Sequence, residues 1–393
     1  MFEYFPGNYV WNLSVVAALN SGGTIDEVDR ACRPIRDAAT RGEDAGTEDF
    51  LRAWSTLVDQ LTTDADAAEA AGRLRTAGQL YFRSSSYLSV AERMLSNSNP
   101  DRIPTYERIL DLTDKAQRLI DPATTRVEIP YTADDAAPGA FLPAYFTKAV
   151  RADGSPAPVV IQWNGLDSTK EHQYTSGFCH ELAARGISTL MVDTPGTGEA
   201  LRLQGLVARP DSEVFASACV DWLEERDDVD VDRIGLVGWS LGGYYAPRAA
   251  AFEKRLALVV AWGANHDWGA VQRSRLEREG ERPVPHYWEH VLWVWGHDDL
   301  DTFIEFADQI NLDGVVEKIT VPFLITHGEN DRQIPLRYAH RSYEQAINSP
   351  KRELRVFTAE EGGAEHVSLD HLPLASSFVA DWIDETFTAV DKS

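Results

Sequence analysis

A serine stands at the centre of the segment 238–242, whose sequence is Gly-Trp-Ser-Leu-Gly. A strand-like apolar run at 234–237 precedes this segment, and a helix-like run follows it. In such a turn the two glycines let the strand and the helix approach closely, and the serine hydroxyl is exposed above the strand. The amide of the next residue begins the helix and points to where negative charge develops on an attacked carbonyl oxygen. The segment therefore predicts that Ser240 is a nucleophile and that the amide of Leu241 is one donor of an oxyanion hole.

A serine hydroxyl is a weak nucleophile near neutral pH, so it needs a base that a third group orients. In the α/β-hydrolase fold these partners follow the serine in the order acid, then histidine. Asp331 lies in a loop after one strand-like run, and His366 lies in the glycine-rich turn 361–367 after the last such run. The order predicts that His366 is the base and Asp331 the acid. Glu329 and His371 are the alternatives, because each lies within a few positions of the residue that it would replace.

Two further loops follow predicted strands. The loop at 163–168 has the sequence Trp-Asn-Gly-Leu-Asp-Ser and follows the third strand, where this fold supplies its second oxyanion donor. The amide of Leu166 is therefore the expected partner of the Leu241 amide. The loop at 193–199 is rich in glycine, but it contains neither Gly-x-x-x-x-Gly-Lys-Ser/Thr nor Gly-x-Gly-x-x-Gly, so it does not predict nucleotide binding.

The elements that must position these residues follow from the periodicity of apolar residues. Alternating or continuous apolar runs predict strands at 126–131, 140–146, 158–163, 187–192, 234–237, 256–260, 322–326 and 354–357. Helix-like segments lie between them, which is typical of an α/β fold with a mostly parallel, doubly wound sheet. Ligands of such sheets bind at the carboxyl ends of the strands, and all the motifs above lie at those ends.

The chain divides into two predicted domains. Residues 1–124 carry apolar residues at three- and four-residue spacing and predict a helical accessory domain. Its helices are expected at 15–19, 25–39, 50–61, 67–95 and 106–120. Residues 125–393 form the predicted α/β-hydrolase catalytic domain.

Residues 263–320 are longer than a simple crossover between strands requires, and they contain four of the eleven tryptophans. We expect this insertion to be a helical cap above the nucleophile that shapes an aromatic pocket. The alternative is a surface elaboration that packs on the amino-terminal helices.

Composition narrows the function classes. Acidic residues number 62 against 37 basic ones, and the formal net charge of −25 disfavours nucleic acid and anionic membranes as partners. The three cysteines are far apart and in no Cys-x-x-Cys spacing, so neither a disulfide framework nor a zinc site is expected. The start lacks the pattern of a secretory leader, and no run is long enough to span a bilayer, so we expect a cytoplasmic protein. We expect a small-molecule substrate, no metal and no cofactor.

The motifs together resemble those of one group of hydrolases. The resemblance rests on the segment 238–245, the loop 164–171, the Pro-Gly-Thr-Gly-Glu loop 195–199, the Gly-Gly-Ala-Glu-His turn and the helical amino-terminal domain. Over nearly its whole length the chain looks like the hydrolases related to 2,6-dihydroxypseudooxynicotine hydrolase and the fungal heptaketide-shortening hydrolases of pigment synthesis.

This resemblance implies hydrolysis by Ser240, Asp331 and His366, often of a carbon–carbon bond beside a ketone in an aromatic or polyketide-like substrate. It also implies a homodimer. Because the group contains esterases, an esterase or lactonase with the same triad is the alternative function. A binding or regulatory homologue without turnover is a third hypothesis.

Cleavage of a 1,3-diketone or an acyl phenol releases an enolate, which needs hydrogen-bond donors in addition to the oxyanion hole. Candidate substrate contacts lie beside the nucleophile, beside the oxyanion loop and in the insertion, and they are Tyr244, Glu171, His172, His266, Asp267 and Tyr287. The alternative for each of them is a solvated or structural side chain.

Overall fold

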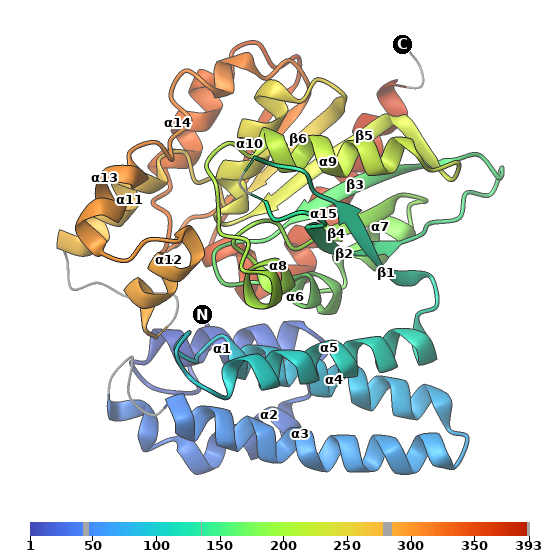
Figure 1. The fold of residues 1–393 in the computed structure, drawn as a ribbon, viewed down its shortest axis with the longest axis vertical. Coiled ribbons are helices and arrows are strands. Elements are labelled where there is room, and N and C mark those ends of the chain that lie inside the picture. Colours follow the sequence, from blue (N-terminus) through green and yellow to red (C-terminus); the bar gives the residue numbers. More distant parts are fainter. Residues whose placement is uncertain (42–46, 135, 278–284, 391–393) are drawn as a thin grey trace.

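The computed structural model describes residues 1–41, 47–134, 136–277 and 285–390. A layer of helices forms the lower part of the molecule in Figure 1, and a sheet covered by helices forms the upper part. The helices of the lower layer are α1 (Tyr9–Asn20), α2 (Ile25–Cys32), α3 (Thr47–Ala70), α4 (Leu74–Glu92) and α5 (Arg102–Ile120), with short 3₁₀ turns η1 (Arg33–Ile35) and η2 (Ala38–Arg41) between α2 and α3. Their apolar faces form one core around Trp11, Trp54 and Tyr87.

Two of the predicted helical segments are interrupted in the structure. The segment expected as one helix at 67–95 is divided, because α3 continues to Ala70 and α4 begins at Leu74. Gly72, at φ 74°, adopts the left-handed conformation that ends helices. The segment expected as a helix at 25–39 ends at Cys32, two residues before Pro34, whose ring and missing amide hydrogen disfavour continuation of the helix.

All eight predicted strands are present and form one sheet. They are β1 (Thr124–Pro130), β2 (Phe141–Thr147), β3 (Ala157–Trp163), β4 (Ser188–Val192), β5 (Val229–Trp239), β6 (Leu256–Trp262), β7 (Phe323–Gly328) and β8 (Arg352–Phe357). Their order in the sheet is β1-β2-β4-β3-β5-β6-β7-β8. The β1–β2 and β2–β4 pairs are antiparallel, and every other pair is parallel.

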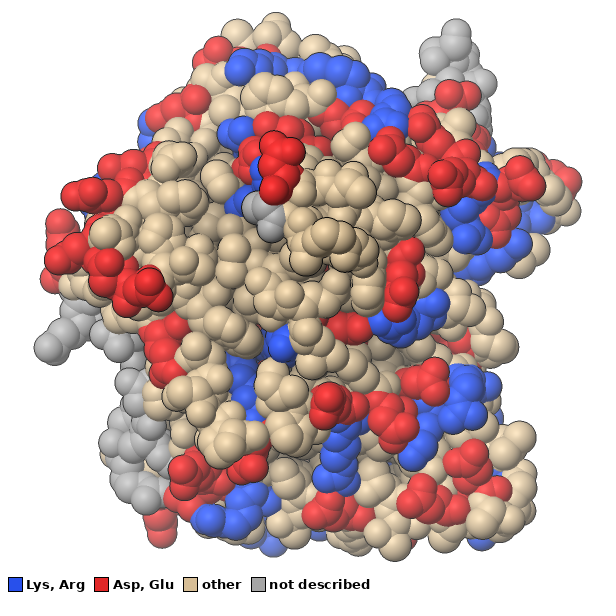
Figure 2. Space-filling view, in the orientation of Figure 1, with Lys and Arg blue, Asp and Glu red and all other residues tan. Residues whose placement is uncertain are grey.

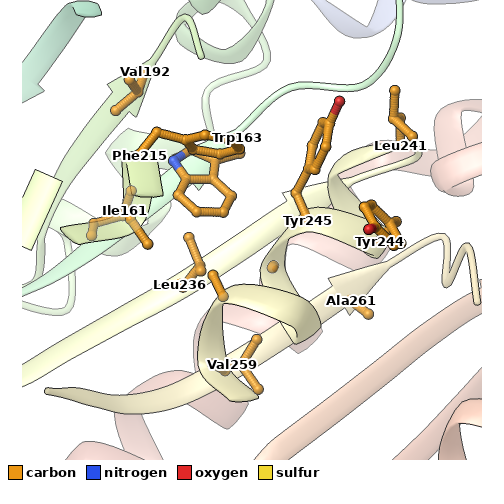
Figure 3. Packing of buried hydrophobic residues seen from close by; sticks show 14 of the residues in the cluster. Ile161, Trp163, Val192, Phe215, Leu236, Leu241, Tyr244, Tyr245, Val259 and Ala261 are labelled. Carbon is orange, nitrogen blue, oxygen red and sulfur yellow. The ribbon is translucent and has the colours of Figure 1, made fainter. Parts of the chain in front are cut away.

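Helices cover both faces of this sheet. On one face Ile161 and Leu236 pack with residues of α9 (Glu213–Glu224) and α10 (Gly242–Phe252), as the close view in Figure 3 shows. On the other face their neighbours in the strands, Val160 and Val237, pack with α7 (Phe178–Ala183) and α15 (Leu372–Val390). Because successive side chains of a strand point to opposite faces, burial on both sides explains why the central strands are continuous apolar runs.

Shorter helices connect the strands at the edge that carries the predicted motifs. They are α6 (Lys170–Thr175), α8 (Gly198–Gln204), α14 (Arg337–Gln345) and the 3₁₀ segment η4 (His366–His371). Between β6 and β7 lie α11 (Trp268–Glu277), α12 (Tyr287–Trp295), α13 (Leu300–Ala307) and η3 (Val316–Lys318). Figure 1 shows α11, α12 and α13 grouped at one end of the sheet, with α12 on the side of the amino-terminal layer.

Charged side chains lie on the surface of the molecule. Figure 2 shows acidic and basic side chains interspersed around the margins of one face, whereas the middle of this face is mostly uncharged. Among the described residues, no helix combines the length and the apolar character that a bilayer-spanning helix requires.

Candidate active site

Ser240 lies in the sharp turn between β5 and α10. Its φ is 56°, a left-handed conformation that is uncommon for residues other than glycine, and its amide donates a hydrogen bond to the carbonyl of Trp262 at 2.9 Å. A Cβ atom at Gly238 would lie 1.9 Å from the carbonyl oxygen of Gly242, so only glycine fits at the end of the strand. The turn therefore has the strained geometry that exposes a nucleophilic hydroxyl.

The three predicted triad residues form a hydrogen-bonded chain. Ser240 Oγ lies 2.8 Å from Nε2 of His366, and Nδ1 of His366 lies 2.8 Å from Oδ2 of Asp331. The other carboxylate oxygen, Oδ1 of Asp331, accepts the backbone amides of Gln333 at 2.7 Å and Ile334 at 3.0 Å. Burial opposes ionisation of Asp331, but the charge and hydrogen bond of His366 outweigh it and lower the pKa of the carboxyl.

The two alternatives for these positions lie elsewhere. Glu329 is exposed, and its Oε1 accepts the amide of Ala359 at 2.5 Å. His371 is exposed at the end of η4, beside Gly362. Asp331, rather than Glu329, is thus the carboxylate that contacts His366.

One residue of the acid loop escaped the sequence analysis. His327 is buried at the end of β7, donates Nε2–H to the carbonyl of Ile334 at 2.8 Å, and lies 3.6 Å from Asp331 Oδ2. Burial lowers the pKa of His327. It therefore holds the turn that presents Asp331. Its place as the fifth residue of a strand gave no sequence signal for this role.

The two amides of the expected oxyanion hole come from the residue after Ser240 and from the loop after β3. Neither the amide of Leu241 nor that of Leu166 has an acceptor in the described part of the chain. A Cβ atom at Gly165 would lie 2.9 Å from Cβ of Ser240, so the loop after β3 passes directly against the nucleophile. His290 of α12 donates Nε2–H to the carbonyl of Leu166 at 3.2 Å, which fixes the loop from the insertion.

A buried charged network anchors the base of the same loop. Asp193, at the end of β4, accepts the side-chain amide of Asn164 at 3.1 Å and the backbone amide of Lys170 at 2.7 Å. The ammonium of Lys170 contacts Asp193 at 3.1 Å, Glu199 at 2.9 Å and Glu171 at 2.7 Å. Burial opposes the charge on Lys170, but these carboxylates outweigh it and raise its pKa. The loop at 193–199, which the sequence marked only as rich in glycine, thus holds the oxyanion loop in place.

A cavity with an empty volume of about 1050 Å³, partly open to solvent, lies above Ser240 and His366. Its walls come from α1, the oxyanion loop, the insertion and η4, and most of the lining is apolar or aromatic, including Leu13, Ala17, Trp239, Trp268, Ile334 and Leu369. The insertion therefore contributes to the pocket and also contacts the amino-terminal layer, where Ser96 donates a hydrogen bond to Glu289 at 2.6 Å.

Two of the candidate substrate contacts line this cavity. His172 lies in the wall beside the oxyanion loop, and Tyr287 lies in the wall formed by the insertion. The hydroxyl of Tyr287 contacts Nη1 of Arg275 at 2.5 Å and donates to Gln272 at 2.6 Å. Arg275 also lines the cavity, and the sequence analysis did not single it out.

The other candidate contacts do not line the cavity. Tyr244 donates its hydroxyl to the carbonyl of Pro210 at 2.9 Å, and Glu171 belongs to the buried network around Lys170. His266 is buried and contacts Ser342 and Asp313, whereas Asp267 accepts the amide of Ala270 at the start of α11. Each of these side chains has internal partners that account for its position. The proximity of these residues to the motifs in the sequence could not reveal these internal partners.

Arg93, which follows α4, is a cavity residue that the sequence analysis missed. It donates to Asp167 Oδ2 at 2.7 Å and 3.1 Å and to Ser14 Oγ at 2.9 Å. Arg93 thereby connects the amino-terminal helices to the oxyanion loop.

Among the described residues, no group of three or more His, Cys, Asp or Glu side chains could hold a metal ion.

A mostly parallel sheet with a serine in a strained turn between strand and helix defines an α/β-hydrolase. Residues 179–389 match the prolyl oligopeptidase family, and residues 62–274 match the esterase FrsA-like family. Each match covers more than half of the chain, which therefore belongs to these hydrolase families.

Among curated proteins, the chain is 28% identical to the hydrolase LUC6 of Fusarium sp over 98% of both chains. It is 28% identical to the 20-hydroxy-prefusarin hydrolase FUS2 of Gibberella moniliformis, over 89% of this chain and 90% of that protein. It is 26% identical to the 2,6-dihydropseudooxynicotine hydrolase of Paenarthrobacter nicotinovorans, over 93% of this chain and 94% of that protein. The crystal structure of the 2,6-dihydroxy-pseudo-oxynicotine hydrolase superposes with a TM-score of 0.74 and 25% identity, over 95% of this chain and 96% of that chain. These matches bear out the sequence-based resemblance and identify the protein as a hydrolase.

Proposed function

We propose that this protein is a serine hydrolase that cleaves a carbon–carbon bond next to a ketone through an acyl-enzyme. Ser240 is the nucleophile, His366 is the general base and acid, and Asp331 orients the imidazole. The amides of Leu166 and Leu241 bind the oxyanion. The substrate is an aromatic or polyketide-like 1,3-diketone or acyl phenol.

The observation that carries this proposal is the continuous chain from Ser240 to His366 to Asp331, with 2.8 Å at both contacts and with the serine in the lining of a cavity. Each contact lies within the range for hydrogen bonds that transfer or orient a proton. The ionised Asp331 stabilises the imidazolium that forms when His366 takes the serine proton.

The nature of the pocket supports a large, partly aromatic substrate. Trp239, Trp268 and Tyr287 supply aromatic surface to the cavity. Relatives named for their action on 20-hydroxy-prefusarin and 2,6-dihydropseudooxynicotine support a substrate of this kind.

The reaction has two stages. Ser240 Oγ attacks the carbonyl carbon while His366 takes its proton, and the tetrahedral oxyanion forms against the two amides. Collapse breaks the bond to the departing carbon and leaves an acyl group on Ser240. A water molecule, activated by His366, then hydrolyses this ester.

An esterase or lactonase is the second candidate function, and the match to the esterase FrsA-like family favours it. The same residues would serve, because an alkoxide leaving group needs only a proton from His366.

A paired panel of 1,3-diketones, acyl phenols and aryl esters distinguishes these functions. We expect wild-type protein to cleave the ketones, with products identified by mass, and Ser240→Ala to cleave none of the panel. Cleavage of esters alone would reject the carbon–carbon assignment. No turnover of any member would favour the binding or regulatory homologue.

A further inference from the structure

One ring nitrogen of His172 already has hydrogen-bond partners within the protein. His172 is the third residue of α6, and its Nδ1 accepts the backbone amide of Thr169 at 3.3 Å and lies 3.2 Å from Thr169 Oγ1 in a capping box. A ring nitrogen that accepts a backbone N–H carries no hydrogen itself. The hydrogen of a neutral ring therefore lies on Nε2, at the opposite edge.

The ring is uncharged at neutral pH. Burial lowers the pKa of His172 to about 4, and the nearby positive charge of Arg93 adds to this effect. A neutral His172 thus keeps one N–H donor, on Nε2, without a charge of its own.

This donor has no partner within the described residues. Nε2 of His172 is shielded from solvent and makes no hydrogen bond, although the residue lines the cavity above Ser240. Buried polar atoms are nearly always satisfied, so an exception in a binding cavity points to a ligand or a bound water.

Other unpartnered polar atoms of the cavity walls fit this role less well. Asn265 Oδ1 is an acceptor and would repel a negatively charged oxygen. Trp239 Nε1 belongs to an indole that packs edge-on against Trp262 within the core, with ring centroids 5.6 Å apart.

We propose that Nε2–H of His172 binds the second oxygen of a 1,3-dicarbonyl or acyl-phenol substrate and stabilises the enolate that carbon–carbon cleavage releases. This assignment rests on the proposed function. The two oxyanion amides bind the oxygen of the attacked carbonyl, so the second oxygen needs a donor of its own.

The step balances without any oxidant or reductant. When the tetrahedral intermediate collapses, the electron pair of the carbon–carbon bond moves toward the second carbonyl and forms an enolate. In an acyl phenol, this second carbonyl is that of the keto tautomer of the ring. His366, which holds the proton taken from Ser240, returns it to the carbon of the enolate. A hydrogen bond from His172 strengthens as charge grows on the enolate oxygen, so it lowers the barrier of this step.

The test compares His172→Phe, which removes the donor, with Thr175→Val. Thr175 lies on the same helix but does not line the cavity, and its hydroxyl donates to the backbone carbonyl of Glu171 at 2.9 Å. We measure kcat with a 1,3-diketone and with an aryl ester. A fluorophosphonate probe, which needs the nucleophile and the oxyanion hole but releases no enolate, reports whether the site is intact.

For His172→Phe we expect diketone kcat to fall by about 10²-fold, in the range for loss of one preorganised donor. Aryl ester turnover and fluorophosphonate labelling should change by less than about threefold. Neither reaction forms an enolate, so His172 makes no contact that strengthens in their transition states. Thr175→Val should retain both activities. A parallel loss of both activities, or no loss of diketone turnover, would overturn the proposal.

A binding measurement separates this proposal from the proposed function. In the Ser240→Ala background, a bound 1,3-diketone should show its enolate absorption band, and Ser240→Ala with His172→Phe should not. If the band depends on His172 but the wild-type enzyme cleaves only esters, the result would support His172 as a donor and reject the proposed cleavage of a carbon–carbon bond. A diketone that binds without the band would overturn the role of His172.

Discussion

Gly165 determines how close the loop after β3 comes to Ser240, the proposed nucleophile. A Cβ atom added at this glycine would lie only 2.9 Å from Cβ of Ser240, which leaves no room for a methyl group, so the loop and the serine are mutually positioned. The donor proposed for this loop, the Leu166 amide, can bind an oxyanion only if its distance from that oxygen is correct.

Gly165→Ala should lower kcat by about 10²-fold, because a displacement of about 1 Å at the reacting atoms costs this much. Steady-state turnover of an aryl ester provides the measurement. Gly154→Ala is the control, since φ is 73° there and no atom lies within 4 Å of the added carbon. That variant should lose some stability through backbone strain but keep its activity.

Asp331→Asn should lower kcat by about 10⁴-fold, because an amide cannot hold the imidazole in the required tautomer or stabilise its charge. Glu329→Gln should leave kcat unchanged, since Glu329 is exposed and contacts the amide of Ala359. The reverse pattern would transfer the role of the acid to Glu329.

At the scale of single residues, sequence reasoning reached the side chains whose order and turn chemistry are constrained by the fold. Ser240, Asp331 and His366 lie in the segments that follow β5, β7 and β8, where the chain order and the turn sequence indicate their positions. Sequence reasoning could not tell which of the neighbours Glu171 and His172 on α6 lines the cavity. Glu171 belongs to the buried network around Lys170, whereas His172 lines the cavity. That difference depends on which parts of the protein pack against each face of α6. A local sequence pattern does not specify these tertiary contacts.

At the scale of elements, the amino-terminal helices join the catalytic domain through a buried charged triad. Glu92 of α4 contacts Arg102 of α5 at 2.9 Å and Arg202 of α8 at 2.8 Å. All three side chains are buried, and removing one partner would leave buried charge without compensation.

Glu92→Gln should lower the free energy of unfolding by about 3–5 kcal/mol, because two buried guanidinium groups lose their counter-charge. Urea denaturation followed by tryptophan fluorescence measures this change. Asp114→Asn breaks an exposed pair with Arg118 and should cost less than about 1 kcal/mol. Equal effects of the two substitutions would contradict the structural importance of the buried charged triad.

The sequence predicted all eight strands, since continuous apolar runs specify strands buried on both faces. It predicted the amino-terminal helices less accurately, because α3 extends beyond its expected limits and Gly72 divides the expected long helix. The contacts of Arg93 and Glu92 across the interface could not be predicted. Such pairs join residues far apart in the chain, and charge alone does not indicate burial.

At the scale of the whole molecule, the active site depends on several layers at once. The side-chain amide of Gln333, in the acid loop, donates to the hydroxyl of Tyr9, and Asn20 donates to the carbonyl of Leu369 near His366. Arg93 and His290 fix the oxyanion loop from the amino-terminal helices and from the insertion. The amino-terminal helices therefore form part of the cavity that Ser240 lines.

The stability of the molecule should decrease in mild acid. Burial lowers the pKa of both His172 and His290 to about 4, below the value of about 6.5 in an unfolded chain. The unfolded chain thus takes up protons first, and the free energy of unfolding should fall as pH decreases from about 6.5 to about 4, by at most about 3 kcal/mol per group.

Denaturation curves at several pH values in this window test the expectation. His290→Gln, which can still donate to Leu166, should show a shallower decline than the wild type. A free energy of unfolding that stays constant or rises between pH 7 and pH 4 would contradict the neutral, buried state of these histidines.

The proposed mechanism depends above all on Ser240 carrying the acyl group of a cleaved ketone. The most direct measurement is acid quenching of the wild-type enzyme during turnover of a 1,3-diketone, followed by peptide mass spectrometry. We predict a mass increase equal to the acyl part of the substrate on the peptide that contains Ser240, and neither adduct nor cleavage products with Ser240→Ala. An adduct on another residue, or diketone cleavage that persists in Ser240→Ala, would contradict this mechanism.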